Sequence, residues 1–261
     1  MSEYTEGLKV TPVVRDLAHR LNVDLTIVTP SGPGESITAE DVQRVHKVLT
    51  ELGPLEKLSG ARKTMAQARE QAVAASVSDD AILAAWGDLA SQDLTLRLIR
   101  ALVAGAKAEP ALNAWFDPIE IGRRVLPKIH LGLAIDTPDG QYICVMQDVA
   151  GRSGESLRKG LDKMKYDTEN RTVPPEELRG YTITLSNYGK FGGRYASPVI
   201  VPPTVAVVAA GKIREAAVAV DGQIKAAKIL PMTVTFDHRV VTGGEAARFL
   251  AAMIKDLEQA H

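Results

Sequence analysis

A histidine near the end of the chain has neighbours that suit acid–base chemistry. His238 lies in the stretch DHRVVTGG, directly after the apolar run Met232–Phe236 and between an aspartate and an arginine. A side chain at the end of a strand is held in place by the sheet, and histidine is the most frequent general base in enzymes. A structural histidine in an ordinary polar loop is the alternative, and the residue types alone leave both readings open.

A serine ends a second predicted strand, in the stretch TITLSNYGKFGGRY. Ser186 is followed by Asn187 and by glycines at positions 189, 192 and 193. Glycines let a backbone come close to a ligand or to another chain, although a tight loop would explain them as well. A hydroxyl and an imidazole at two strand ends could act as an oxyanion donor and a base.

The other histidines and the single cysteine give weaker signals. His19, His46 and His261 fall on predicted surface helices or at the terminus, where solvated polar roles are expected, and His130 begins a predicted strand. Cys144 has no paired base in the sequence, so a small buried side chain is expected rather than a nucleophile. A single cysteine excludes an intrachain disulfide. We predict no metal site.

The composition indicates a soluble globular protein with one large domain, or a large domain and a small one. Of the 261 residues, 45% are hydrophobic and 24% are charged, and the formal net charge is -1. This balance gives no electrostatic reason to expect nucleic acid or an acidic membrane as a partner. No apolar run approaches the roughly 20 residues that span a bilayer. Since a signal peptide is also absent, a cytoplasmic location is expected.

Hydrophobic spacing predicts an α/β domain that would position these residues. Helices are predicted at Pro12–Leu21, Thr38–Leu49, Arg62–Val73, Asp93–Ala108, Ser153–Tyr166 and Glu245–Gln259. Strands are predicted at Val77–Trp86 (with Ala81–Trp86 equally compatible with a helix), His130–Ile135, Tyr142–Met146, Tyr181–Ser186, Thr204–Ala210 and Met232–Asp237. Asp221-Gly222 predicts a hairpin turn within Val218–Lys225. The first two helices form a small unit suited to docking, and Gly53-Pro54 marks its boundary.

The chain resembles the dihydrolipoamide acyltransferases of 2-oxo acid dehydrogenase complexes in several stretches that follow the family's order. Their catalytic domain is matched by LSGARKTMAQAREQ, LTLRLIRALVAGAKAEPALNAWFD, IHLGLAIDTPDGQYICVMQDV, LSNYGKFGGRYASPVIVPPTVAVVAAG and DHRVVTGGEAARFL. Their peripheral-subunit-binding domain is similar to VTPVVRDLAHRLNVDLTIVTPSGPGESITAEDV. The resemblance implies an all-α subunit-binding domain at residues 8–46, a linker at 47–56 and an acyltransferase domain at 57–261. That domain is expected to have the two-layer fold of chloramphenicol acetyltransferase, with a mixed sheet and flanking helices.

The resemblance implies acyl transfer between S-acyl-dihydrolipoamide and coenzyme A, without a metal or redox cofactor. His238 would take the proton from the coenzyme A thiol, because the thiolate is the competent nucleophile, and Ser186 would donate a hydrogen bond to the oxyanion. Family protomers form trimers in which the histidine and the serine come from neighbouring chains, so a homotrimer is expected. Thr242 is the third position assigned to catalysis. Contacts with coenzyme A are expected at Asn187, Gly189, Arg239 and Gly243.

The sequence departs from the family pattern at several positions. Thr242 replaces the usual aspartate or asparagine, so either a less ordered loop and a lower rate, or an accepted variant, is expected. Cys144 and Gln147 stand in a strand usually written with a proline and a basic residue. Arg15 is retained but Ser36 replaces a second arginine, so docking to dihydrolipoamide dehydrogenase and/or the 2-oxo acid decarboxylase component through residues 8–46 is expected to be weaker. No lipoyl domain is found, so the lipoyl group would come from a truncated segment or from another chain.

Three further expectations concern assembly, acyl group and alternatives. The polar end Leu257–His261 predicts a trimer that does not assemble into a larger core, because burying those groups unpaired would be unfavourable. The stretch GGRYASPVIVPPTVAV is more similar to branched-chain and some acetyl-transferring members than to succinyl-transferring ones, so an acetyl or short branched-chain acyl group is expected. The alternatives are a non-catalytic core or scaffold protein of such a complex, and a chloramphenicol-type acetyltransferase, which has no use for a subunit-binding segment.

Overall fold

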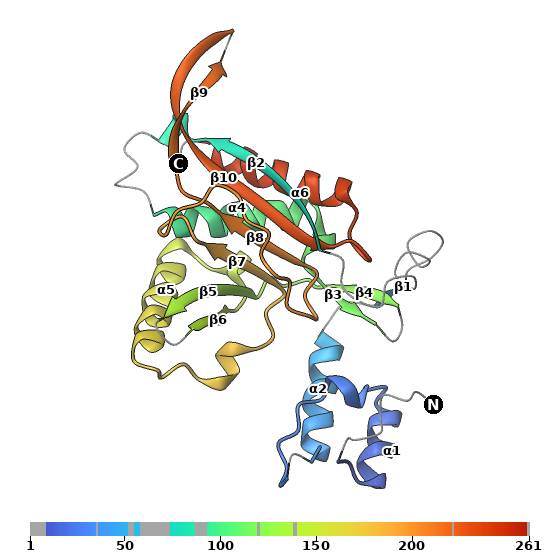
Figure 1. Ribbon diagram of the computed structural model, residues 1–261. Helices are drawn as coiled ribbons and strands as arrows, with labels where there is room; N and C mark the ends of the chain where they lie inside the picture. The colour runs from blue at the N-terminus through green and yellow to red at the C-terminus, as the bar shows by residue number, and fades with distance from the viewer. Residues whose placement is uncertain are drawn as a thin grey trace. The chain divides into compact units, whose positions relative to one another are not determined.

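The computed structural model describes residues 9–34, 36–51, 55–57, 74–86, 93–118, 121–137, 140–220 and 222–259 (Figure 1). The chain divides into two compact units, one ending at Pro54 and the other beginning at Leu55. The predicted helix at Arg62–Val73 lies outside the described residues, as do Asp221 and His261.

The first unit is helical, as predicted. Helix α1 (Pro12–Arg20) begins after Thr11, whose hydroxyl accepts a hydrogen bond from the amide of Val14. A short 3₁₀ turn, η2 (Leu25–Ile27), precedes helix α2 (Ala39–Glu51). The small core consists of the buried apolar side chains of Val14, Ala18, Val23, Leu25, Val28, Ile37 and Val42.

A buried carboxylate fastens the loop between these two helices. Asp41 is 1% exposed and accepts hydrogen bonds from the amides of Ser31 and Thr38 at 2.9 and 3.0 Å and from the Ser31 hydroxyl at 2.7 Å. Arg44 also pairs with it. Burial raises the pKa of the Asp41 carboxyl, but the hydrogen bonds from Thr38 and Ser31 outweigh burial and hold the pKa far below its ordinary value.

The second unit is built on a seven-stranded mixed sheet. Its strand order is β2-β10-β8-β7-β5-β6, with β9 paired to β10. The strands are β2 (Ala74–Ile82), β5 (Leu131–Thr137), β6 (Gly140–Met146), β7 (Ile183–Asn187), β8 (Ala206–Ala210), β9 (Arg214–Val220) and β10 (Gln223–Asp237). Strand β7 runs parallel to β5 and β8, and the other pairs are antiparallel. The mixed sheet confirms the predicted α/β class.

Among the described residues of this unit, three long helices form the second layer. They are α4 (Leu94–Ala108), α5 (Gly154–Glu169) and α6 (Gly243–Leu257). Helix α4 contacts both α5 and α6, while α6 packs on β2 and β10, and α5 packs on β5 and β6 (Figure 1). Gly105 permits the close approach of α4 to α6, since a Cβ there would lie 2.8 Å from Cγ of Met253. Fully buried side chains between the layers include Leu98, Leu102, Leu230, Met232, Phe236 and Phe249.

The structure contains a second sheet, of three strands, that is not predicted from the sequence. Its order is β1-β4-β3, and the strands are β1 (Leu55–Lys57), β3 (Ala114–Asp117) and β4 (Gly122–Val125). The amide of Phe116 donates to the carbonyl of Pro203 at 2.8 Å, and Trp115 forms a bridge with Thr204. The small sheet is thus joined to the segment that leads into β8.

Strand β10 is longer than the sequence suggests. The predicted segments at Val218–Lys225 and Met232–Asp237 belong to one hairpin, whose second strand continues for 15 residues through Pro231. Gly222 lies in the predicted turn with a φ of +74°. Strand β9 and the first half of β10 project beyond the main sheet (Figure 1). The long strand ends immediately before His238 and therefore positions the candidate base.

Val77–Trp86 is predicted as a strand, with Ala81–Trp86 equally compatible with a helix, and the structure contains both a strand and a helical turn here. Strand β2 begins earlier, at Ala74, and ends at Ile82. The following Ala84–Trp86 forms the 3₁₀ turn η3. The remaining 3₁₀ turns are η5 (Pro110–Leu112), η6 (Val149–Gly151) and η7 (Pro175–Leu178).

Candidate active site

His238 lies in a tight turn directly after β10. The amides of Val240 and Val241 donate to the carbonyl of Asp237 at 3.1 and 3.0 Å and close this turn. The imidazole is half-buried, and its ring centre lies 5.6 Å from that of Phe236. Its Nδ1 is buried and has no hydrogen-bond partner among the described residues. An unpaired buried polar atom is unfavourable by about 1–3 kcal/mol, so such atoms often mark sites of function.

Asp237 and Arg239 form a buried ion pair within the same turn. Their exposed fractions are 2% and 8%. Arg239 donates from Nε to Oδ1 of Asp237 at 3.0 Å, from Nη2 to Oδ2 at 2.6 Å and from its amide to Oδ1 at 3.0 Å. Its guanidinium carbon also lies 4.2 Å from the ring centre of Phe116 on β3. This geometry lets Arg239 fix the turn, whereas its contact with coenzyme A stays a prediction.

Thr242 is the N-cap of α6. Its hydroxyl accepts a hydrogen bond from the amide of Glu245 at 3.2 Å, and the Glu245 carboxylate accepts from the amide and the hydroxyl of Thr242 at 2.7 and 2.8 Å. Such a reciprocal capping box satisfies helix N-terminal donors that would otherwise lack partners. The order that it gives to this segment favours threonine as an accepted variant over a less ordered loop. The catalytic role predicted for Thr242 stays a prediction.

Glu245 links this cap to the small sheet. Its side chain is buried, and Oε1 accepts a hydrogen bond from Nη1 of Arg123 on β4 at 3.1 Å. Burial raises the pKa of the Glu245 carboxyl, but the hydrogen bonds from Thr242 and the charge and hydrogen bond of Arg123 outweigh burial and hold the pKa below its ordinary value. Gly243, the first residue of α6, has open space beside it, since a Cβ there would meet nothing within 4 Å.

Ser186 lies near the C-terminal end of β7. His238 follows the C-terminal end of β10, which runs in the opposite direction, so the two residues lie toward opposite ends of the strands. Ser186 pairs with Ala209 of β8, which pairs in turn with Thr233 of β10. Because Thr233 precedes His238 by five residues, the two candidates are roughly 19 Å apart at about 3.3 Å per residue and about 4.8 Å per strand. The structure therefore does not bring Ser186 and His238 together within one chain.

The loop after Ser186 is held by close contacts between backbone segments. Oδ1 of Asn187 accepts a hydrogen bond from the amide of Gly189 at 3.2 Å. A Cβ on Gly189 would overlap the carbonyl oxygen of Gly211, and a Cβ on Gly211 would overlap that of Arg194. Gly193 has a φ of +82°, in the region that favours glycine. These contacts explain the glycines within one chain, and the coenzyme A contacts of Asn187 and Gly189 stay predictions.

The cysteine is a buried side chain, as predicted. Cys144 is 0% exposed, and burial raises the pKa of its thiol. Its sulfur lies 3.6 Å from the hydroxyl oxygen of Thr168. The described residues contain no group of three or more histidine, cysteine, aspartate or glutamate side chains that could hold a metal ion.

The remaining histidines have separate environments. His19 is exposed, as predicted. His46 is half-buried, with Nδ1 3.1 Å from the carbonyl oxygen of Leu21, so the predicted solvated role is wrong for it: the ring satisfies a carbonyl at the end of α1. Nδ1 of His130 accepts a hydrogen bond from the amide of Asp148 at 3.1 Å, which favours a structural role.

Arg15 lies in the first unit. It is exposed on α1, the helix on which Val13 is 74% exposed. The hydroxyl of Ser36 donates to the carbonyl of Pro33 at 2.9 Å, so this residue closes its own loop. Exposed basic and apolar side chains on one helix are suited to docking.

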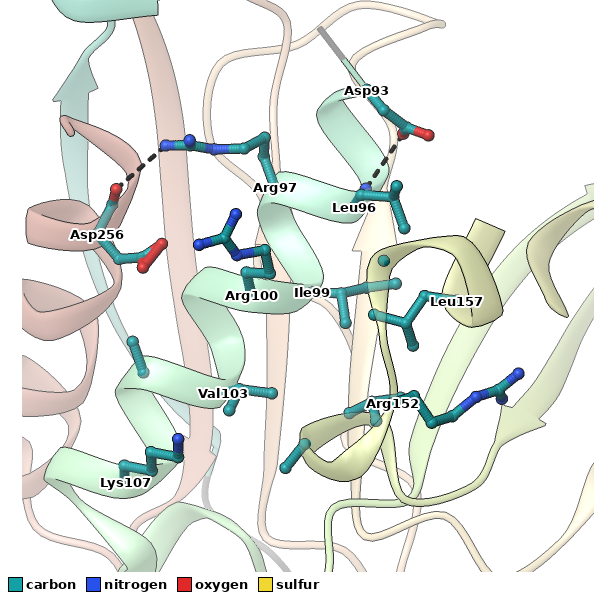
Figure 2. Close-up of a pocket in the computed structure, with 14 residues that line it drawn as sticks. Asp93, Leu96, Arg97, Ile99, Arg100, Val103, Lys107, Arg152, Leu157 and Asp256 are labelled. Atoms are coloured by element: carbon teal, nitrogen blue, oxygen red, sulfur yellow. Dashed lines mark hydrogen bonds between the residues drawn. The ribbon is translucent and has the colours of Figure 1, made fainter. Parts of the chain in front are cut away.

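A groove of about 650 Å³ lies between α4 and the start of α5 (Figure 2). Arg97, Arg100 and Lys107 line its α4 side, and neither Ser186 nor His238 borders it. Arg97 points toward the last turn of α6, where it donates to the carbonyl of Asp256 at 3.2 Å (Figure 2). These contacts stabilise a helix end at a distance from the candidate site.

Sequence reasoning missed Arg123 and Glu245. Charged residues are rarely buried, and an arginine in a short strand carries no local signal of burial. The pattern from Thr242 to Glu245, a threonine followed three positions later by a glutamate before an apolar run, is a capping-box signature that could have revealed Glu245.

Family models match nearly the whole chain. The model of the 2-oxoacid dehydrogenases acyltransferase (catalytic domain) matches residues 55–261, and the model of the e3 binding domain matches residues 8–43. In the part of the chain that the structure describes, no helix is long and apolar enough to cross a membrane.

Curated relatives match over most of this chain at low identity. The dihydrolipoyllysine-residue acetyltransferase component of the acetoin cleaving system of Bacillus subtilis is 27% identical over 97% of this chain and 70% of its own length. The lipoamide acyltransferase component of the branched-chain alpha-keto acid dehydrogenase complex of Pseudomonas aeruginosa is 30% identical over 93% of this chain and 64% of its own length.

Solved structures share the fold of the second unit. The dihydrolipoamide acetyltransferase of Azotobacter vinelandii has a TM-score of 0.67 and 21% identity, over 76% of this chain and 85% of that chain. A chloramphenicol acetyltransferase has a TM-score of 0.52 and 14% identity, over 78% of this chain and 100% of that chain. The predicted chloramphenicol-acetyltransferase-like fold is confirmed.

Proposed function

This chain belongs to the 2-oxoacid dehydrogenase acyltransferases, and on that premise we propose that it transfers an acetyl or short branched-chain acyl group between S-acyl-dihydrolipoamide and coenzyme A. The observation that carries the proposal is the imidazole of His238, which directly follows the long strand β10 and has a buried Nδ1 without a hydrogen-bond partner among the residues that the structure describes. The turn that holds it is closed on both sides, by the Asp237–Arg239 ion pair and by the Thr242 cap.

The chemistry assigned to these residues is a proton transfer followed by an acyl transfer. The imidazole of His238 takes the proton from the coenzyme A thiol, and the thiolate attacks the thioester carbonyl carbon. The hydroxyl of Ser186 donates a hydrogen bond to the oxyanion of the tetrahedral intermediate. When that intermediate collapses, the dihydrolipoyl sulfur leaves and takes the proton back from the imidazolium.

The spacing of the three proposed catalytic residues supports this assignment. A serine, a histidine and an asparagine are named in the catalytic mechanism of the Azotobacter vinelandii enzyme, and they are separated by 52 and 4 positions. Ser186, His238 and Thr242 have the same two separations. Threonine shares with asparagine the ability to cap a helix, which is the contact that Thr242 makes here.

The distance between Ser186 and His238 within one chain supports a site made by two chains. We propose a homotrimer in which the histidine of one protomer meets the serine of the next, as in other members of the family. A closed ring of three copies makes three equivalent sites. Coenzyme A is proposed to lie against Asn187, Gly189, Gly243 and the turn of Arg239.

The acyl group is proposed to be uncharged. On the loop after Ser186, the guanidinium of Arg194 donates to Asp80 at 2.8 Å, and the hydroxyl of Tyr195 donates to the same carboxylate at 3.0 Å. The Arg194 charge is thereby engaged by a carboxylate of the protein rather than left to pair with a succinyl group. Small apolar residues, Ala209 and Ala210, lie beside the end of β7.

The first unit is proposed to dock partner enzymes. We assign residues 8–46 to binding dihydrolipoamide dehydrogenase and/or the 2-oxo acid decarboxylase, with the exposed Arg15 pairing with an acidic surface. The lipoyl group is proposed to be presented by another domain or chain. The boundaries at 8–46, 47–56 and 57–261 and the cytoplasmic location stay predictions.

An assay with free dihydrolipoamide and acetyl-CoA tests the proposed function. His238→Ala is expected to abolish turnover, and Ser186→Ala to lower kcat by about 100- to 1,000-fold through loss of the oxyanion donor. The exposed His19 provides the matched control, and His19→Ala should retain the wild-type rate. A wild-type protein without turnover above background would instead favour a non-catalytic scaffold protein, and equal, measurable rates for wild type and His238→Ala would remove His238 as the base.

A further inference from the structure

We propose that Arg123 is a positioning residue for His238, which fixes the turn of the imidazole to the first turn of α6. The assignment rests on the proposed function, because it concerns the same site. Arg123 touches neither proposed substrate in this assignment and acts only through the backbone that carries the base.

The contacts of Arg123 converge on both sides of the turn. Its side chain is buried, and Nη1 donates to the carbonyl of Val240 at 2.9 Å and to Oε1 of Glu245 at 3.1 Å. Val240 stands two residues after His238, and Glu245 lies in the first turn of α6. One guanidinium nitrogen therefore ties the catalytic turn to the helix that follows it.

The ion pair of Arg123 and Glu245 also holds Thr242, which lies between Val240 and Glu245 in the sequence. The carboxylate of Glu245 accepts hydrogen bonds from the amide and the hydroxyl of Thr242. Val240 is thus held by Arg123, and Thr242 is held by Glu245, which Arg123 itself orients. Loss of the Arg123 cation would leave a buried carboxylate with less compensation for its charge and would loosen both attachments.

The small three-stranded sheet holds the residues that make these contacts. In the register of the sheet, Arg123 on β4 lies opposite Phe116 of β3, whose ring stacks on Arg239, and opposite Glu56 of β1. The three-stranded sheet therefore reaches the turn of His238 at two points, through Arg123 to Val240 and through Phe116 to Arg239. This gives a function to a sheet that the sequence does not predict.

The expected consequence is kinetic. Proton transfer requires the base within about 2.6–3.2 Å of the donor, and a misplacement of about 1 Å can lower a rate by about 100-fold. A displaced imidazole lowers the rate of the chemical step. Coenzyme A binding is little changed, because two of its proposed contacts, Asn187 and Gly189, lie on the loop after β7, and Arg239 keeps its ion pair with Asp237. The effect should therefore fall on kcat and not on KM.

Arg97 offers a matched control for this test. It is 6% exposed, as is Arg123, and it also donates to backbone carbonyls of or beyond α6, but at the opposite end of that helix. Figure 2 shows its guanidinium directed to the last turn of α6. Arg97→Met removes a buried arginine without touching the turn of His238.

The experiment measures kcat, KM and thermal unfolding of full-length Arg123→Met, Arg123→Lys, Arg97→Met and His238→Ala. We expect Arg123→Met to lower kcat by about 10- to 100-fold with KM for coenzyme A within about twofold. Arg123→Lys, which keeps a donor near the Nη1 position, should recover at least about a fifth of the wild-type kcat. Arg97→Met should lower the melting temperature and keep the wild-type kcat.

Each outcome separates the positioning role from the proposed function. A wild-type kcat in Arg123→Met beside an inactive His238→Ala would overturn the positioning role alone. A fully active His238→Ala would overturn the proposed function. An equal loss of kcat in Arg97→Met and Arg123→Met would overturn the positioning role by showing a general effect of destabilisation. Should Arg123→Met fail to fold, Glu245→Gln replaces it: a kcat lowered at least about fivefold at constant KM supports the role, and an unchanged kcat overturns it.

Discussion

Ser186 and His238 lie on the same sheet of one chain but roughly 19 Å apart, because Ser186 is level with Thr233 in the strand register and His238 follows five residues later. A hydroxyl at that distance cannot stabilise an oxyanion formed beside the imidazole. The two residues can share one site only if they come from different protomers. The proposed reaction is therefore tied to a particular assembly.

Thr242 is expected to act mainly through its helix cap. Thr242→Ala removes the hydroxyl that accepts from the amide of Glu245 and should destabilise the protein by about 1 kcal/mol. Thr242→Asn keeps a capping acceptor and should remain within about 0.5 kcal/mol of wild type. Denaturant unfolding of both variants checks this, and equal stability of wild type and Thr242→Ala would contradict the role of the cap.

Glu245 should make stability depend on acid pH. Its pKa in the folded protein lies below the ordinary value of 4.5, so its stabilising contribution is present above that pH and is lost as the pH falls below it. Glu245→Gln should therefore unfold at a lower temperature than wild type at neutral pH, and the difference should shrink below about pH 4.5. Thermal unfolding from pH 7 to pH 3 measures this difference. A difference that stays constant over the whole range would show that the carboxylate is not stabilised by its partners.

Two glycines of the site should respond differently to alanine. Gly189→Ala places a methyl group against the carbonyl oxygen of Gly211 and should destabilise the protein by about 1–3 kcal/mol. Gly243→Ala meets no neighbour and should leave stability unchanged or raise it by up to about 1 kcal/mol. If coenzyme A lies against Gly243, this second variant raises KM for coenzyme A several-fold. An unchanged KM would remove Gly243 from the coenzyme A site.

Asp41 should govern the order of the first, helical unit. Asp41→Asn replaces a buried carboxylate that accepts from Ser31 and Thr38 and should destabilise the loop between α1 and α2 by about 3 kcal/mol. Hydrogen exchange in the full chain should show faster exchange at the Ser31 and Thr38 amides. The exposed Asp16 serves as the control, and Asp16→Asn should exchange as wild type does. Unchanged protection in Asp41→Asn would mean that other contacts order the loop.

The long helices and the core strands of the fold are predictable from the sequence, because their apolar residues recur at regular spacing. Strand β10 is harder to predict, since Pro231 reads as an interruption and Lys225 and Lys228 obscure the apolar pattern before it. In the structure, Pro231 stays in the sheet and its carbonyl accepts from the amide of Gly211 at 2.9 Å. The short strands β3 and β4 show no alternation and are defined only by their partners.

The catalytic candidates are also predictable from the sequence, whereas the residues that hold them in position are not. His238 and Ser186 stand at strand ends with recognisable flanking residues, so local sequence identifies them. The burial of Arg123 depends on contacts made across the fold, and the two-residue spacing of Asp237 and Arg239 does not by itself indicate that they form a buried ion pair. No local pattern reports that an arginine 115 positions before the histidine holds its turn.

Activity of mixed trimers tests the central claim most directly. Ser186→Ala and His238→Ala chains are combined in equal amounts, by coexpression or by joint refolding, and the product is assayed beside each variant alone. If every site takes its histidine from one protomer and its serine from the next, random mixing restores about a quarter of the sites to wild-type composition. The account therefore predicts recovery of about a quarter of the wild-type rate from two nearly inactive variants. A mixture no more active than the average of the two variants would contradict a site shared between chains.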